Sequence, residues 1–134
     1  MIIRLIDFGL VILIWMTQLV VYPSFTYFSS ENLFTWHQKY TTVISIIVMP
    51  LMIGQVALHS YQLYQGFSGL RLLAFVLIIL AWANTFLVAV PLHNKINANV
   101  DIIDAANSLV KINWYRTVLW SGVFLVGLYE HLRN

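Results

Sequence analysis

The chain has 134 residues, of which 60% are hydrophobic and only 9% are charged. A soluble domain carries about 25% charged residues, so this composition excludes a water-soluble globular fold. Cysteine is absent, which excludes disulfides and thiolate ligands to a metal. The net charge of +2 comes from cations scattered between apolar runs, which excludes the basic stripe of a nucleic-acid-binding protein and favours anionic lipid headgroups.

Four long apolar segments predict an all-α integral membrane protein, a single four-helix transmembrane bundle. The apolar runs are continuous, where the strands of a barrel would alternate, and each reaches the roughly 20 residues that cross a hydrocarbon core. Pro50 lies near the middle of the second segment and predicts a kink there. The expected spans are residues 5–25, 36–64, 70–91 and 109–128.

Aromatic residues gather at the ends of these spans, as an interfacial belt requires. The segment before the fourth span carries apolar residues at helical spacing, so it predicts an amphipathic helix that continues into that span. Its apolar face comprises Ile102, Ile103, Ala106, Leu109 and Val110, opposite Asp101, Asp104 and Asn107. The belt comprises Tyr22, Tyr27, Trp36, Tyr40, Tyr61, Tyr64, Trp114, Tyr115 and Tyr129.

The sequence contains a faint internal repeat. Residues 15–23 resemble residues 82–91 with one position of slippage, and residues 42–45 resemble residues 117–121. Two related hairpins, running through the membrane in the same direction, would explain both similarities. The biased composition of membrane helices is the alternative explanation.

Four spans place both termini on one side of the membrane, called here the terminal side, together with the loop between the second and third spans. Arg4, Arg71 and Arg133 lie on that side, and Lys39, Lys95, Lys111 and Arg116 lie towards the other. The cations are nearly balanced, and Arg4 beside the first helix favours a cytoplasmic terminal side in a bacterial inner membrane. A second copy of the chain or a membrane partner subunit is a further expected partner besides lipid.

Polar residues accumulate at the non-terminal end of every span, which predicts a site there. Asn113 and Arg116 share one face of the fourth span with Trp120, and an arginine within a span either faces the interior or snorkels to the interface. The candidate catalytic residues are His37, His93, Asn113 and Arg116. The candidate substrate-binding residues are Gln18, Tyr22, Tyr40, Asn84 and Asn94.

The histidines leave other interpretations open, although no cofactor is favoured. His37 and His93 could bind a metal with Glu31 and one of Asp101 or Asp104, since imidazole and carboxylate form a plausible ligand set. Haem ligation would pair His37 with His93, or His59 with His131. Gln55, His59 and Gln62 share a face near the terminal side, where hydrogen bonds between helices or headgroup contacts are expected.

Two short motifs carry a resemblance to a known family. The first is VPLHNK at Val90 to Lys95, and the second is KINWYRT at Lys111 to Thr117. With the Tyr-Pro pair that ends the first span, they resemble the small four-helix bacterial membrane proteins of the anthrone-oxygenase-like group. The matching positions are Pro91, Asn94, Asn113 and Arg116, whereas His93 replaces a frequent asparagine and Trp114 follows Asn113 in place of an earlier tryptophan.

The resemblance implies a four-helix membrane fold and, from a few members, cofactor-free oxygenation of a polycyclic phenolic compound. The first functional hypothesis is therefore an oxidoreductase or oxygenase-like membrane enzyme acting on an apolar ring or lipid-like substrate. His37 or His93 would be the general base, Arg116 would stabilise an oxyanion, and Asn113 and Asn94 would fix the geometry. The alternatives are a non-catalytic small membrane subunit and a metal- or haem-binding membrane protein.

Overall fold

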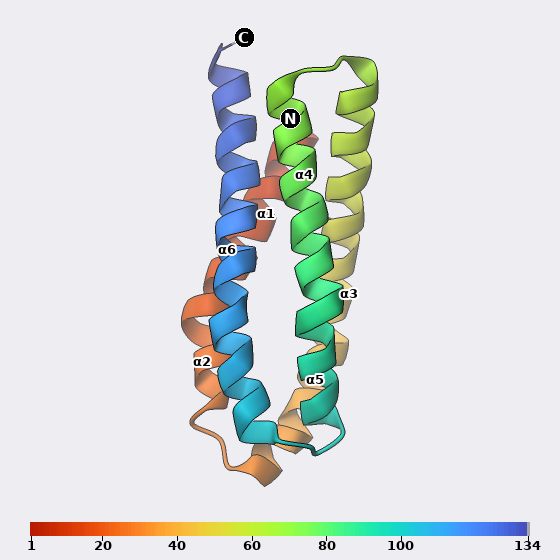
Figure 1. Ribbon diagram of the computed structural model, residues 1–134. Coiled ribbons are helices and arrows are strands. Elements are labelled where there is room, and N and C mark those ends of the chain that lie inside the picture. Colours follow the sequence, from red (N-terminus) through yellow and green to blue (C-terminus); the bar gives the residue numbers. More distant parts are fainter. Residues whose placement is uncertain (134) are drawn as a thin grey trace.

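Three short loops join four helical rods into an up-and-down bundle in the computed structural model, which describes residues 1–133 (Figure 1). The first rod is α1 (Ile2–Met16), η1 (Thr17–Val21) and α2 (Tyr22–Phe25), and the second is α3 (Ser30–Gln65). The third is α4 (Gly69–Asn84), η2 (Thr85–Ala89) and α5 (Val90–Asn97), and the fourth is α6 (Ile102–Arg133). Residues 1–133 contain no strand, and the predicted all-α bundle is confirmed.

The first three rods are long and apolar enough to cross a membrane, which makes this an integral membrane protein. They contain 24, 36 and 29 residues. The fourth rod has 32 residues and a more polar composition, and it lies along the other rods throughout the height of the bundle (Figure 1). It must therefore cross the membrane beside them. Its polar residues can lie at membrane depth because they face the other helices and not the lipid.

The rods extend further than the predicted spans, and the third does so at its far end because Pro91 does not terminate it; the first rod ends at Phe25, as predicted. The third rod continues past Pro91 to Asn97, and α3 begins at Ser30, where the Ser29 hydroxyl accepts a hydrogen bond from Asn32 N–H. Pro91 and Pro23 stand in the first turn of α5 and α2, a position that tolerates proline. The second rod is continuous through Pro50, and the kink expected there stays a prediction.

Each of these two prolines follows a π-helical segment at the same distance. Thr17 begins η1 six positions before Pro23, and Thr85 begins η2 six positions before Pro91. The sequences TQLVVYP and TFLVAVP then align without a gap, and each threonine hydroxyl donates to the carbonyl four residues earlier at 2.8 Å. A widened turn accommodates a proline that cannot donate to the preceding turn. This shared feature supports the prediction of two related hairpins.

The start of α6 is amphipathic, with one difference from the predicted face. Ile102, Ala106 and Leu109 are buried, and Asp104 is exposed. Ile103 is 65% exposed, so its predicted place in the apolar face is wrong. One residue rotates the side chain by about 100°, which turns Ile103 outward and leaves Ala105 in the core.

Most of the predicted aromatic belt is exposed, including Tyr27 and Tyr64 near the ends of their rods, whereas Tyr115 lies 13 residues after the start of α6. Tyr22 is different, because only 3% of it is exposed. Its assignment to the belt is therefore wrong, and its side chain lies inside the bundle.

Gly54 provides a test of the packing between α1 and α3. A Cβ at this position would lie 3.1 Å from Ile6 Cδ1, whereas a Cβ at Gly9 would meet nothing within 4 Å. We expect Gly54→Val to lower the stability of the bundle by about 1–3 kcal/mol through overpacking. The measurement is the midpoint of thermal unfolding in detergent, with Gly9→Val as the matched control. Equal midpoints for the two variants would contradict this packing.

Candidate functional site

A continuous row of hydrogen-bonded side chains crosses the non-terminal half of the bundle and joins all four rods. Arg116 Nη2 on α6 lies 2.9 Å from Tyr22 Oη on α2, which lies 2.8 Å from His93 Nε2 on α5. His93 Nδ1 then lies 2.8 Å from His37 Nε2 on α3, and His37 Nδ1 lies 2.7 Å from Asn97 Oδ1. We call these five residues the polar row.

Further hydrogen bonds hold the arginine end of the polar row. Arg116 Nε donates to Asn113 Oδ1 at 3.0 Å, and Asn113 Nδ2 donates to Gln18 Oε1 at 3.0 Å. Gln18 Nε2 in turn donates to the Val110 carbonyl at 3.2 Å. The guanidinium is therefore fixed by amides from two rods.

The other end of the polar row is held by a threonine. Asn97 Nδ2 donates to Thr41 Oγ1 at 3.3 Å, and that hydroxyl donates to the His37 carbonyl at 3.1 Å. Because the Asn97 amide nitrogen is used by Thr41, its oxygen faces His37. The group that His37 Nδ1 meets is therefore a hydrogen-bond acceptor, Asn97 Oδ1.

The two ends dictate where the protons lie along the polar row. Arginine only donates, so Tyr22 Oη accepts from Arg116 and donates its own proton to His93 Nε2. An amide oxygen only accepts, so His37 Nδ1 carries a proton and donates it to Asn97. With neutral rings, His93 Nδ1–H then donates to His37 Nε2. All the hydrogen bonds therefore run in one direction, away from Arg116.

Arg116 is a buried cation, and its hydrogen-bond partners in the described part of the chain are neutral. Only 6% of the residue is exposed, which shows that the snorkelling alternative is wrong. The close contacts between basic and acidic side chains among residues 1–133 are His59 with Asp7 and Arg71 with Glu130, and neither includes Arg116. Burying a charge in a bilayer is costly unless an opposite charge accompanies it.

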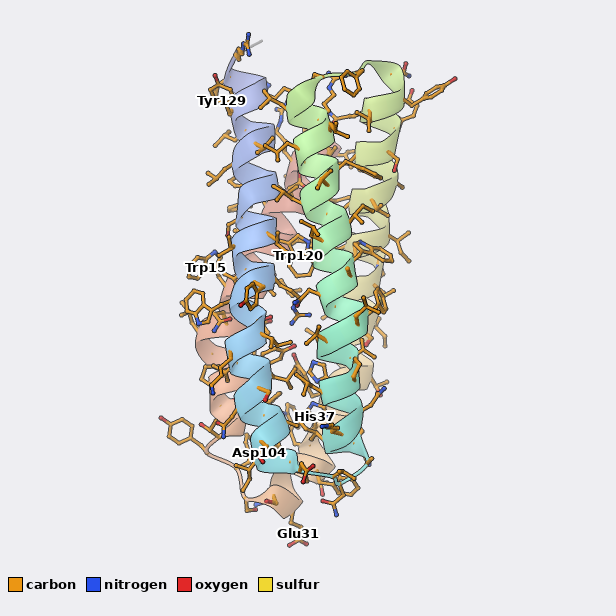
Figure 2. The ribbon with its side chains drawn as sticks, viewed as in Figure 1. Trp15, Glu31, His37, Asp104, Trp120 and Tyr129 are labelled. Carbon is orange, nitrogen blue, oxygen red and sulfur yellow. The ribbon has the colours of Figure 1, made fainter. Side chains whose placement is uncertain are left out.

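A cavity of about 380 Å³ lies beside the polar row. Tyr22, His93 and Arg116 line it, whereas His37 and Asn113 are 0% exposed and stand behind them. Towards the middle of the bundle the cavity is bounded by Met52 and Trp120, and Figure 2 shows Trp120 at mid-height and His37 near the non-terminal end. The exposed residues Thr42, Ser45 and Asn94 border it between α3 and α5, where it opens towards the lipid.

The π-helical segments explain why the site residues face this cavity. In an α-helix, residues five apart point in different directions, but a π turn brings them to the same face. Thr17 and Tyr22, five apart across η1, both line the cavity, and so do Thr85 and Val90 across η2. His93 follows Val90 by three positions and so remains on that face.

Aromatic contacts hold the imidazole rings in place. The rings of His37 and His93 are stacked with centroids 5.0 Å apart, and Phe25 meets His37 edge-on at 5.4 Å. Tyr40 packs against both Phe25 and His37, with ring centroids 5.4 and 5.9 Å away, and it lines the cavity. Rings packed on several sides keep the orientation that the hydrogen bonds require.

The structure brings together nearly all of the predicted site residues. The four candidate catalytic residues join the same network as Gln18 and Tyr22, and Tyr40 and Asn94 line the adjacent cavity. Asn84 does not take part. Its Oδ1 is buried without a hydrogen-bond partner among residues 1–133, and the residue that lines the cavity at this level is its neighbour Thr85. Asn97 was missed, although it follows His93 by four positions and so shares its face.

The geometry gives no support to the metal and haem interpretations. His37 and His93 bond directly to each other at 2.8 Å, a separation that leaves no space for an ion or a porphyrin between them. Glu31, Asp101 and Asp104 are exposed at the non-terminal end, and Figure 2 shows Glu31 and Asp104 there. Within residues 1–133 no group of three or more His, Cys, Asp or Glu is arranged to hold a metal. His131 is exposed near the C-terminus.

A second buried polar cluster lies in the terminal half of the bundle. Asp7 accepts from Gln55 Nε2 at 2.7 Å and lies 3.1 Å from His59 Nε2, and Trp120 Nε1 donates to Gln55 Oε1 at 3.1 Å. The predicted hydrogen bonding between helices is thus confirmed for Gln55 and His59. Asp7 was missed as their partner because it lies close to the end of its span.

Comparisons with protein-family models, with curated proteins and with solved structures find no significant match to this chain. The resemblance to the anthrone-oxygenase-like group therefore stays a prediction.

The direction of the polar row can be tested by ¹⁵N NMR of labelled histidine in detergent. We expect the neutral forms of both His37 and His93 to carry their proton on Nδ1. Asn97→Ala removes the acceptor of the His37 Nδ1 proton and should shift the His37 Nδ1 resonance, whereas Asn107→Ala, at an exposed position, should change neither ring. A proton on Nε2 of His93 in the unaltered protein would contradict the direction.

Proposed function

We propose that this protein is a membrane-embedded enzyme that performs acid–base chemistry on an apolar ring or lipid-like substrate bearing a hydroxyl or carbonyl oxygen. The observation that carries the proposal is a buried arginine with no carboxylate partner among residues 1–133, beside a hydrogen-bonded Tyr22–His93 pair and a largely apolar cavity. A developing oxyanion would complete this arrangement.

The cavity suits such a substrate in shape and chemistry. Its polar residues, including Tyr22, His93 and Arg116, lie towards the non-terminal end, and Val48, Met49 and Met52 on α3 line the part nearer mid-membrane. Flexible methionines adapt to differently shaped apolar groups. The substrate oxygen would therefore point to the polar row and its apolar body towards the bilayer centre.

The reaction step supported by this geometry is proton transfer along the polar row. The proton of a bound hydroxyl moves to Tyr22 Oη while the Tyr22 proton moves to His93 Nε2. His93 then holds protons on both nitrogens, and its Nδ1–H shares the positive charge with His37. The substrate is left as an oxyanion beside Arg116, so proton and charge balance.

These roles refine those that the sequence suggested. His93 is the candidate base because it lines the cavity, and His37 is a positioning residue because it lies behind His93. Asn97 positions His37, and Asn113 with Gln18 positions Arg116.

An oxygenase-like reaction would begin with the same step. An ionised phenol ring is richer in electrons than the neutral phenol, so it is the form that would reduce dioxygen, the required co-reactant. In this proposal the terminal side is cytoplasmic in a bacterial inner membrane, and the cavity serves the outer leaflet.

A non-catalytic membrane subunit is the second candidate, because the polar row joins all four rods and would also brace them. The two candidates differ in whether the cavity binds and ionises a ligand. A brace requires only that the hydrogen bonds hold the rods together.

The proposed function can be tested with 2-naphthol, whose phenol and phenolate forms absorb at different wavelengths. We expect the protein in detergent to bind the probe as phenolate at a pH where free probe stays neutral. We also expect it to accelerate deuterium exchange at the ring carbon beside the hydroxyl. Tyr22→Phe and Arg116→Gln should each weaken phenolate binding about tenfold or more, since each removes a charge-assisted hydrogen bond.

The control is Tyr27→Phe, which removes the hydroxyl of a residue that is 90% exposed and should leave both readouts unchanged. If the unaltered protein neither ionises the probe nor accelerates exchange, while Arg116→Gln only lowers thermal stability, the bracing candidate is correct and the enzyme proposal fails.

A further inference from the structure

Asp7 and His59 form a buried pair at the inner end of a second cavity, which opens at the terminal side. Asp7 is 2% exposed and His59 is 4% exposed, and both line this cavity of about 210 Å³. A buried carboxylate within a membrane bundle marks a functional site more often than a structural one. The function proposed above does not use this pair.

His59 can receive a proton from this second cavity. Its Nε2 faces Asp7, and its Nδ1 makes no hydrogen bond to residues 1–133. The buried side-chain atoms left without a partner in that range are Trp82 Nε1 and Asn84 Oδ1, so the unpartnered His59 Nδ1 is not sealed from the cavity. A proton arriving at Nδ1 would turn the pair into an imidazolium and a carboxylate.

The other charged groups around the pair do not neutralise the Asp7 carboxylate in place of this proton. Arg71 Nε is bonded to Glu130 at 2.7 Å, and its Nη1 donates to the carbonyls of Gln62 and Gly66 at the end of α3. No described ion pair joins Asp7 to an arginine. The titratable and charged groups that share the cavity with the pair are Arg4, Arg71, Glu130 and His131.

We propose that Asp7 and His59 form a proton-binding site open to the terminal side. We further propose that a proton bound there favours an anion in the first cavity, beside the polar row, which we call the membrane cavity. The coupling rests on the proposed function, whereas the proton site does not. Gln55 and Trp120 connect the two places, because Gln55 bonds to Asp7 and Trp120, and Trp120 lines the membrane cavity one turn from Arg116.

The sign of the coupling follows from charge. With His59 neutral, Asp7 is a buried negative charge that disfavours a second anion in the bundle. Proton binding cancels that charge and so favours anion binding beside Arg116, and the bound anion favours the proton to the same extent.

The size of the coupling follows from the separation. A Cβ at Gly127 would lie 3.8 Å from Asp7 Oδ2, and Gly127 is about three turns from Arg116 on α6, roughly 16 Å. At this separation and an effective dielectric constant of about 20, the coupling changes affinity about fivefold.

The proton site is tested first, by ¹⁵N NMR of His59 during a pH titration without ligand. We expect His59 to carry protons on both nitrogens at the acidic end of the titration and on Nε2 alone at the alkaline end. Asp7→Asn removes the counter-charge and should shift this change to lower pH, while Glu31→Gln, at an exposed position of the non-terminal end, should leave it in place. A His59 that never gains the second proton in the folded protein would overturn the proposal.

The coupling is tested by the affinity for the 2-naphthol phenolate, because two variants should change it in opposite directions. Asp7→Asn removes the negative charge, so its affinity at alkaline pH should be about fivefold tighter than that of the unaltered protein. His59→Gln keeps a donor to Asp7 but cannot take up a proton, so its affinity at acidic pH should be about fivefold weaker.

Glu31→Gln is the control and should stay within about twofold, since Glu31 is exposed at the non-terminal end and solvent screens its charge. Equal phenolate affinities in all three variants would overturn the coupling. If the phenolate is not bound at all while His59 still titrates, the proposed function fails and the proton site stands. If either variant fails to fold, the other still gives a signed result.

Discussion

The buried guanidinium of Arg116 is the constraint on which the non-terminal half of the bundle depends. A cation held in a low-dielectric interior must be surrounded by oriented acceptors, because water is excluded there. Asn113 and Tyr22 supply them, and each is itself bonded to a further group. The hydrogen bonds therefore spread outward from one charge until they include all four rods.

The prolines and the π turns allow that spread to occur inside a membrane. A proline in the middle of an α-helix would leave a carbonyl unpaired in lipid, but at Pro23 and Pro91 the chain widens beforehand and then begins a new helical turn. The widened turns also rotate Tyr22 and His93 inward. The same local feature thus preserves backbone hydrogen bonding and aims the reactive side chains.

The accuracy of the sequence-based predictions follows this distinction. On α6 the ordinary helical spacing holds, so Asn113, Arg116 and Trp120 were correctly placed on one buried face. On the first and third rods it does not, and the inward position of Tyr22 could not be read from a period of 3.6 residues. The burial of Asp7 could not be predicted either, because burial near the end of a span depends on how far the neighbouring rods extend. Length and hydropathy, in contrast, were sufficient for the four rods themselves.

The two buried clusters are alike in construction but differ in how completely their charges are balanced. In the terminal half, the Asp7 carboxylate lies against a histidine that can take up a proton and neutralise it. In the other half, the hydrogen-bond partners of the Arg116 guanidinium among residues 1–133 are neutral and offer only dipoles. Within residues 1–133, the buried anion therefore has a group that can balance its charge, whereas the buried cation has none. That asymmetry is why an external oxygen anion, delivered through a cavity that opens towards lipid, is the partner that this site fits best.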